Sequence, residues 1–319
     1  MRLLILSLLL AGSLAAAAPA AEPLVSADWL EGQLGGAGVR IVDIRNGGAD
    51  ETFDQGHVPG AVHGEYGTAG WRTDVAGVPG MTPEVASLEA LIGGLGIDNE
   101  SHVVIVYSGA DASDFGAAAR VYWTFNYLGH DDVSILDGGW RGWTEGGDRP
   151  VATGPASVTP ATFTADVRPD FLIETAEVEA TLDDPAVLRL DARPRSQYIG
   201  ETKAGPARAP GRLPDALGLE QAVFFTDDGR LKERGEIAAL VPAEVTDGGV
   251  ETVVSYCNTG HWAATNWFVL SELLGQENVR LYDASMTGWS ADPARPLEIG
   301  GESLLAQVSR WVGAPCATC

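Results

Sequence analysis

The sequence predicts an α/β protein built from two tandem copies of one unit, each a parallel sheet with helices on both faces. Short, apolar, β-branched runs alternate with longer segments of helical spacing, a pattern typical of strand–helix–strand units whose strands pair in parallel. The alternation occurs twice at matching intervals, which indicates an internal repeat. With 319 residues and 45% hydrophobic content, the chain can bury a core without extra cross-links.

The repeat is clearest between residues 103–150 and 252–296. Both segments contain a Leu-Gly pair, ending at Gly129 and Gly275. From these glycines an aspartate follows after 8 residues, a tryptophan after 14 and a proline after 21, in both copies. We therefore expect a first domain at residues 24–150, a Pro-, Thr- and Ala-rich linker at 151–171, and a second domain at 172–300.

The expected elements follow the same order in both units. Near-continuous apolar runs predict strands that are buried on both faces. In chain order these are residues 39–44, 102–108 and 133–136, then 187–192, 251–257 and 279–282. Helical spacing predicts helices over 117–129 and 263–275, and both end at a glycine, the residue most often found just past a helix.

Residues 1–20 resemble a secretory signal peptide rather than part of the fold. They contain one positive charge at Arg2, a Leu-rich run and then small residues, with Ala18-Pro19-Ala20 as a cleavage site. A membrane anchor is the alternative, but the Leu-rich run is far shorter than the roughly 20 apolar residues that a membrane-spanning helix needs. We expect a periplasmic or secreted protein whose mature form has no membrane span.

Export would place the three cysteines in an oxidising compartment. Cys316 and Cys319 form a C-x-x-C pair in the tail, residues 301–319, where a small disulfide is expected. A redox motif or a sulfur relay are the alternatives for this pair. Cys257 then has no partner, so its thiol requires another explanation.

The formal net charge of −24 argues against a nucleic-acid partner, because nucleic-acid binding needs a basic face. An anionic ligand would be repelled by the molecule as a whole, so its site must be locally positive. The most basic segment contains Lys203, Arg208 and Arg212. It could supply this positive patch or be a solvated loop.

Cys257 lies at the carboxyl end of a predicted strand, where parallel sheets bind their ligands. We expect the next helix to start near Ala263, which leaves a six-residue connection. Such a loop can direct several backbone N–H groups into one concavity, and a helix N-terminus adds positive potential. Both effects favour the thiolate, the nucleophilic form of cysteine. A buried structural cysteine is the alternative. The candidate anion-binding residues of the loop are Asn258, Thr259, Gly260, His261 and Trp262.

The first unit begins its corresponding loop with Ser108 instead of cysteine, so we expect it to be non-catalytic. Two tandem units that each have an early Asp-x-Arg strand end, with a cysteine loop only in the second, resemble the rhodanese-type sulfurtransferases. The GHVPGAVH turn at residues 56–63 and the DGGWRGW segment at 137–143 add to the likeness, which covers nearly all of residues 24–300.

The resemblance implies that Cys257 takes up a sulfane sulfur as a persulfide, from thiosulfate or 3-mercaptopyruvate, and passes it to cyanide or a thiol. It also implies that Arg193 faces the cysteine pocket and binds the anionic donor, whereas Asp191 supports the structure. An ion pair between these two residues is the alternative. A phosphatase loop closed by arginine is disfavoured, because the sixth residue after the cysteine is Ala263.

The loop sequence matches neither the basic loop of the thiosulfate branch nor the small, hydroxyl-rich loop of the mercaptopyruvate branch, so the donor stays open. His261 is the one loop side chain that can carry a positive charge or donate a proton. No metal-binding or nucleotide-binding motif is present, and neither a metal nor an organic cofactor is expected. Two alternatives to the enzyme remain: a non-catalytic sulfur carrier or partner-binding protein, and a thiol oxidoreductase that uses Cys257 with Cys316 and Cys319.

Overall fold

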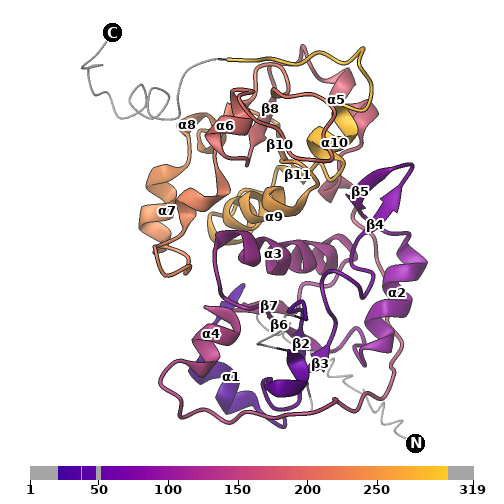
Figure 1. Cartoon of the computed structure of the whole chain (residues 1–319), viewed down its shortest axis with the longest axis vertical. Coiled ribbons are helices and arrows are strands. Elements are labelled where there is room, and N and C mark those ends of the chain that lie inside the picture. The colour runs from indigo at the N-terminus through magenta and orange to yellow at the C-terminus, as the bar shows by residue number, and fades with distance from the viewer. Residues whose placement is uncertain (1–20, 37, 48–51, 301–319) are drawn as a thin grey trace, which may run out of the picture.

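The computed structural model describes residues 21–36, 38–47 and 52–300. The expected signal peptide and the Cys316/Cys319 pair therefore lie outside the described residues. Figure 1 shows two α/β units stacked on one another, with helices α3 (Ala112–Tyr127) and α9 (His261–Phe268) side by side between their sheets. The predicted fold class is confirmed.

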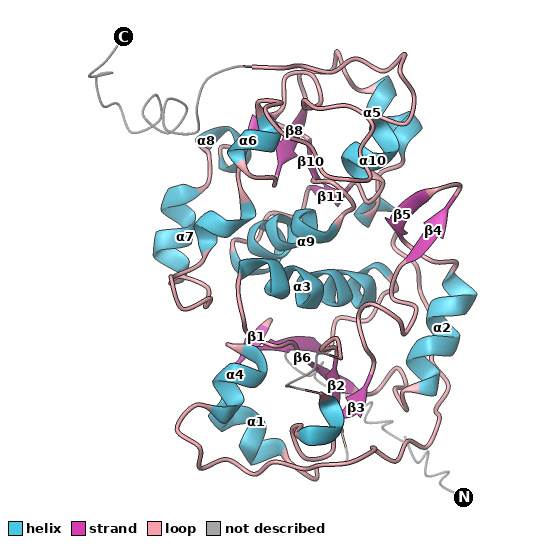
Figure 2. Cartoon of the chain, viewed as in Figure 1, coloured by secondary structure: helices cyan, strands magenta, loops and turns pink. Residues whose placement is uncertain are grey.

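The first unit contains a five-stranded parallel sheet. The strand order is β1 (Leu24–Val25), β7 (Val133–Leu136), β6 (His102–Val106), β2 (Val39–Asp43) and β3 (Val62–His63). Figure 2 shows α3 on one face of this sheet and α1 (Ala27–Gln33) and α4 (Gly139–Thr144) on the other. The remaining elements are α2 (Val85–Gly94), a 3₁₀ turn (Phe53–Gln55) and an antiparallel hairpin of β4 (Thr73–Val75) and β5 (Val78–Met81).

The second unit repeats the design with four parallel strands. Their order is β11 (Val279–Leu281), β10 (Thr252–Tyr256), β8 (Val187–Asp191) and β9 (Leu217–Gly218). The helices are α5 (Thr175–Ala180), α6 (Arg195–Tyr198), α7 (Arg234–Leu240), α8 (Ala243–Thr246), α9 and α10 (Ser285–Trp289). Two 3₁₀ turns (Pro169–Phe171 and Gln221–Phe224) complete the unit.

Side chains of the central strands alternate between two apolar layers, as a sheet covered on both faces requires. In β10, Val253 packs into the layer that contains α9, whereas Val254 and Tyr256 pack with Trp289 of α10 on the opposite face. All four are at most 1% exposed. The near-continuous apolar runs seen in the sequence are therefore explained by burial on both faces.

The two units share one apolar core where α3 and α9 pack together. Phe115 of α3 lies edge-on to Phe268 of α9, with ring centroids 5.5 Å apart. Polar bonds also cross the boundary: Thr82 donates its N–H and its hydroxyl to Asp283 Oδ2, both at 2.8 Å, and the Tyr122 hydroxyl donates to Glu272. The unit with the cysteine is therefore held firmly against the unit without it.

Both of the predicted helices start earlier than expected. The helix α9 begins at His261 rather than near Ala263, because Gly260 adopts a left-handed φ of 70° and turns the chain directly into the helix. Helix α3 begins five residues before the expected start, at Ala112, because the Asp111 carboxylate accepts from Asp114 N–H and caps it. After Phe268 the chain continues as a π-helical turn, Val269–Leu273. Within the described chain, no helix combines the length and apolarity needed to cross a membrane.

Candidate active site

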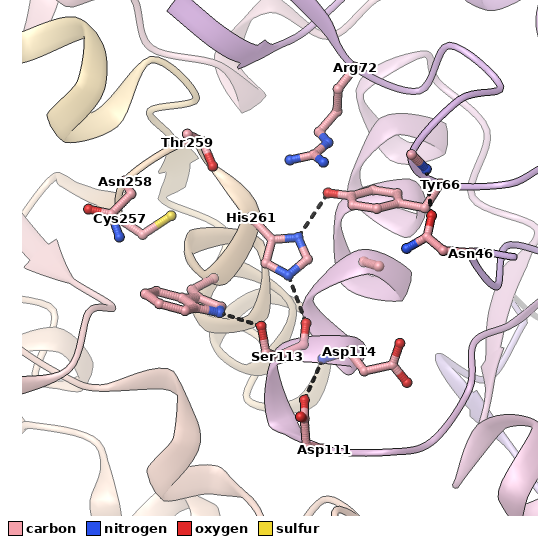
Figure 3. Close-up of a pocket in the computed structure, with 13 residues that line it drawn as sticks. Asn46, Tyr66, Arg72, Asp111, Ser113, Asp114, Cys257, Asn258, Thr259 and His261 are labelled. Atoms are coloured by element: carbon pink, nitrogen blue, oxygen red, sulfur yellow. Dashed lines mark hydrogen bonds between the residues drawn. The ribbon is translucent and has the colours of Figure 1, made fainter. Parts of the chain in front are cut away.

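A cavity of about 530 Å³ lies between the two units at the carboxyl end of β10. Figure 3 shows its side chains, which come from both units. Its lining residues are Asn46, Tyr66, Gly67, Arg72, Asp111, Ser113, Asp114 and Ala117 from the first unit, and Cys257, Asn258, Thr259, His261 and Trp262 from the second. Four of the five predicted loop residues therefore surround one cavity, together with the cysteine.

Cys257 is the free cysteine of the described residues and is 1% exposed. Its backbone is fixed from two sides, because its N–H donates to Ser285 Oγ at 3.0 Å and its carbonyl accepts from Met286 N–H at 3.1 Å. In Figure 3 the sulfur points from the end of β10 toward the cavity. The thiol is thus sheltered from bulk water but lines the space in which a small molecule can reach it.

Not all N–H groups of the cysteine loop are free to bind an anion, in contrast to the expected concavity of free donors. Ser285 Oγ accepts from the N–H groups of both Cys257 and Gly260, at 3.0 and 3.2 Å, so these two donors are already occupied. Among the described residues, the N–H groups of Asn258 and Thr259 have no hydrogen-bond partner. An anion at the sulfur can therefore be bound by two loop amides and the first turn of α9.

Ser285 was not predicted from the sequence. It is completely buried, has an unusual φ of 48°, and donates its hydroxyl to the carbonyl of Tyr282 at 2.7 Å. The donated hydrogen leaves both lone pairs of the oxygen to accept the two loop amides. No local sequence signal marks this serine, because its role depends on contact with a loop 28 residues earlier in the chain.

His261 is a neutral hydrogen-bonding residue in this site. Its Nε2 lies 2.7 Å from the carbonyl of Ser113, which can only accept, so Nε2 carries the hydrogen and Nδ1 accepts from the Tyr66 hydroxyl at 2.9 Å. Burial lowers the pKa of His261 to about 4, and the positive charges of Arg72 and Arg120 act in the same direction. His261 therefore offers an anion in the cavity no positive charge near neutral pH.

The other loop residues mainly shape the walls. Trp262 donates its indole N–H to Ser113 Oγ at 2.8 Å, and Asn258 donates its amide to Gln197 at 2.8 Å. Gly260 does not line the cavity, because it is the cap at which α9 begins. Thr259 lies against Gly80 of the β4–β5 hairpin, since a Cβ on that glycine would be only 2.9 Å from Thr259 Cβ.

Arg193 does not line the cavity. Its Nε and Nη2 donate to both oxygens of Asp191, at 2.8 to 3.1 Å and 2.5 Å, and Nη2 also donates to the carbonyl of Gly211. Both side chains of the pair are at most 1% exposed. The first unit contains the same buried pair between Arg45 and Asp43. The ion-pair alternative is thus the observed one, and the predicted donor-binding role of Arg193 has no support in this geometry.

The basic segment is also engaged elsewhere. Lys203 donates to the carbonyl of Ala207, Arg212 pairs with Glu298 at 2.9 Å, and neither lines the cavity. Instead, the cation of the cavity is Arg72, which comes from the unit without the cysteine. The negative net charge predicted that an anion site must be locally positive. The packing of the two units shows that the first unit supplies this positive charge.

In the first unit a carboxylate occupies the loop that corresponds to the cysteine loop. Asp114 Oδ2 accepts from the Ser108 hydroxyl and from the N–H groups of Gly109 and Ala110, at 2.7 and 3.2 Å for the two amides. The amide concavity that an anion would use is therefore filled by the chain itself. This arrangement supports the expectation that the first unit is non-catalytic.

The described residues contain no cluster of three or more His, Cys, Asp or Glu side chains that could hold a metal ion. The chemistry that the arrangement itself offers is nucleophilic. A sheltered thiol faces a cavity with free amides, a neutral imidazole and one guanidinium, which suits a small anionic electrophile.

The family profile described as "Rhodanese-like domain" matches residues 26–146 and 174–292. Two curated relatives align over 88% of this chain and 98% of their own length. They are a Mycobacterium bovis protein named "Putative thiosulfate sulfurtransferase 1", 32% identical over 287 residues, and a Thermus thermophilus protein named "Sulfur carrier protein TtuD", 29% identical over 295 residues.

Among solved structures, an anaerobic ergothioneine biosynthesis enzyme from Chlorobium limicola, in complex with trimethyl histidine, superposes with a TM-score of 0.73. The match covers 88% of this chain and 71% of that one at 22% identity, so the two proteins share the fold.

Proposed function

Because the chain belongs to the rhodanese family of sulfurtransferases, we propose that it transfers a sulfane sulfur from thiosulfate or 3-mercaptopyruvate, through a persulfide on Cys257, to cyanide or a thiol. The observation that carries the proposal is the position of this thiol, at the carboxyl end of β10 and against a cavity with two unpaired loop amides.

With thiosulfate as donor, the Cys257 thiolate attacks the outer sulfur. A new S–S bond forms on the enzyme, the S–S bond of thiosulfate breaks, and its electron pair leaves with sulfite. The persulfide keeps the single negative charge of the thiolate, and the amides of Asn258 and Thr259 are the donors available to it. In the second step, cyanide or a thiolate attacks the outer sulfur and Cys257 leaves again as a thiolate.

A sulfur carrier is the second candidate, because the Thermus thermophilus relative is named as one. A carrier would take up one sulfur but show little turnover with small acceptors. We also propose that the protein is exported, on the basis of the pattern in residues 1–20. The mass of the N-terminal peptide of the protein isolated from its host tests this localisation.

The function is tested by the intact mass of the reduced full chain after incubation with thiosulfate and, separately, with 3-mercaptopyruvate. We expect one added sulfur atom that is released as thiocyanate when cyanide is added. Cys257→Ser should abolish the addition, and Cys316→Ser should leave it unchanged. If no donor adds sulfur to reduced Cys257, the proposed function is wrong; if Cys316→Ser abolishes turnover, the oxidoreductase alternative is favoured instead.

The matched control uses the other loop. Ser108→Cys in the Cys257→Ser background places a thiol at the start of the first unit's loop. We expect it to stay unmodified, because Asp114 already occupies the amides there. Sulfur uptake by this variant would show that a thiol at either strand end suffices.

A further inference from the structure

Among the described arginines, Arg72 is the one whose side chain lines the cavity, and no carboxylate is paired with it. Within the described residues it has no salt bridge and no hydrogen bond, and its Nε is buried without a partner. Its one interaction is a stacking contact over the ring of Tyr66, at 4.2 Å from the ring centroid. Arg72 is half-buried, so water still reaches part of the guanidinium, but no described carboxylate neutralises its charge.

Arg72 directly precedes the β4–β5 hairpin, which reaches across to the second unit. A Cβ on Gly80 would lie 2.9 Å from Thr259 Cβ and 3.6 Å from Arg72 Nη1, so the guanidinium and the cysteine loop meet at the same point. In Figure 3 Arg72 points from the first unit into the space between Thr259 and Tyr66, above His261. The hairpin is fixed there, because Val78 and Met81 pack on the apolar layer of the second unit.

The second unit offers a corresponding arginine to the first, which provides a comparison within the chain. Arg230 lies in the turn between Phe225 and Leu231, and its Nη1 would be 3.1 Å from a Cβ on Gly138, beside the first unit's loop. Unlike Arg72, it is paired with three carboxylates: Glu145, Asp228 at 3.7 Å and Asp137 at 3.8 Å. Each unit thus presents an arginine to the other, and only the one at the cysteine loop is left without an anion.

Among the described residues, none of the other polar side chains that line the cavity offers a positive charge to an anion beside Cys257. His261 is neutral, and both ring nitrogens are engaged by Tyr66 and Ser113. On the wall formed by α3, Asp111 and Asp114 bring negative charge. A dianion that enters next to Cys257 is therefore repelled by these two carboxylates and attracted to the side where Arg72 lies.

We infer that Arg72, from the non-catalytic unit, binds the terminal oxyanion of the sulfur donor and makes the active site a composite of both units. This inference rests on the proposed function and concerns its donor step only. A guanidinium fits the sulfonate oxygens of thiosulfate as a two-pronged donor, and it stabilises the charge that collects on sulfite as the S–S bond breaks. The acceptor step, in which sulfite has left, makes no use of it when the acceptor is cyanide.

The test compares Arg72→Met with Arg230→Met, the matched arginine of the first unit's loop. The rate of persulfide formation on Cys257 is measured by rapid-quench mass analysis at several thiosulfate concentrations. We expect Arg72→Met to lower the second-order rate of sulfur uptake by about 10- to 100-fold, the effect of losing one charged hydrogen-bonding partner. Arg230→Met should stay within about twofold of the parent protein, and discharge of preformed persulfide by cyanide should be unchanged in both variants.

A second readout separates donor binding from a structural role. Methanethiosulfonate carries one negative charge where thiosulfate carries two, so its uptake should fall less in Arg72→Met, and Arg72→Lys should restore part of the thiosulfate rate. Equal losses with both donors, or a loss in Arg230→Met as large as in Arg72→Met, would overturn the inference. If the parent protein forms no persulfide with any donor, the proposed function itself fails, which is a distinct outcome.

Discussion

Gly260 provides the most quantitative test of how the cysteine loop is built. Its φ of 70° lies in the left-handed region, and a Cβ there would collide with Arg120 Nη1 and lie 2.8 Å from Asp283 Cα. Arg120 cannot easily retreat, because it is 1% exposed and donates to the carbonyls of Gly80 and Gly260 and to Thr82 Oγ1. Replacement by alanine must therefore displace the loop, the arginine or both.

The expected cost has two parts. Holding alanine in a left-handed conformation costs about 1–2 kcal/mol, and overpacking a well-packed interior costs about 1–3 kcal/mol. Gly260→Ala should thus lower the free energy of unfolding by about 2–5 kcal/mol. Gly275 supplies the control, because it has a φ of 76° but a Cβ added there would meet nothing within 4 Å. Gly275→Ala should show the backbone part alone, about 1–2 kcal/mol.

The assay is denaturant unfolding of both variants, followed by tryptophan fluorescence and circular dichroism, together with the rate of persulfide formation. We expect Gly260→Ala to lose more stability than Gly275→Ala and to lose sulfur uptake as well. Equal losses in the two variants would refute the reasoning, because they would show that the contacts with Arg120 and Asp283 carry no cost.

Two further outcomes follow from buried charges. The pKa of His261 is about 4 in the folded state against an ordinary 6.5, so between these pH values the unfolded chain binds a proton that the folded chain does not. The stability linked to this residue is therefore complete above pH 6.5 and falls by up to about 3 kcal/mol as the pH drops toward 4. The difference in unfolding free energy between the parent protein and His261→Gln across that range measures this loss, and a pH-independent difference would contradict it. Asp191→Asn leaves Arg193 as an uncompensated buried cation and should lower the free energy of unfolding by about 3–5 kcal/mol, measured by denaturation. Asp131→Asn, at an exposed ion pair with Arg168, is the control and should lower it by at most about 1 kcal/mol. Similar losses in the two variants would argue against the burial of the Asp191–Arg193 pair.

The elements that the sequence predicts well are those with a local signature. The strands at 252–256 and 102–106 lie inside the predicted runs because burial on both faces requires continuous apolar residues. The repeat is visible for a similar reason, since matched intervals preserve the spacing of strand, helix and turn. The position of Cys257 at the end of β10 follows directly from these two patterns.

The parts that escaped prediction depend on contacts between distant segments. Residue type alone does not distinguish Arg193 from Arg72. In the structure, Asp191 pairs with Arg193, whereas Arg72 lines the cavity against the second unit. His261 belongs to a residue type that can carry a charge, but its burial by residues near 66 and 113 keeps it neutral. Ser285 has a role only because its oxygen meets a loop far away in the chain.

If the proposed function is right, the shared core between α3 and α9 limits which molecules can accept the sulfur. Because the two units are joined by apolar packing and by the bonds of Thr82 and Tyr122, they cannot separate to admit a folded partner without losing that core. In the proposed mechanism, the persulfide on Cys257 is discharged inside a cavity of about 530 Å³, so the recipient has to be a small molecule or a narrow, protruding chain end. Donor and recipient then use the same space in turn, and an excess of either one should slow the other, as substrate inhibition in the steady state.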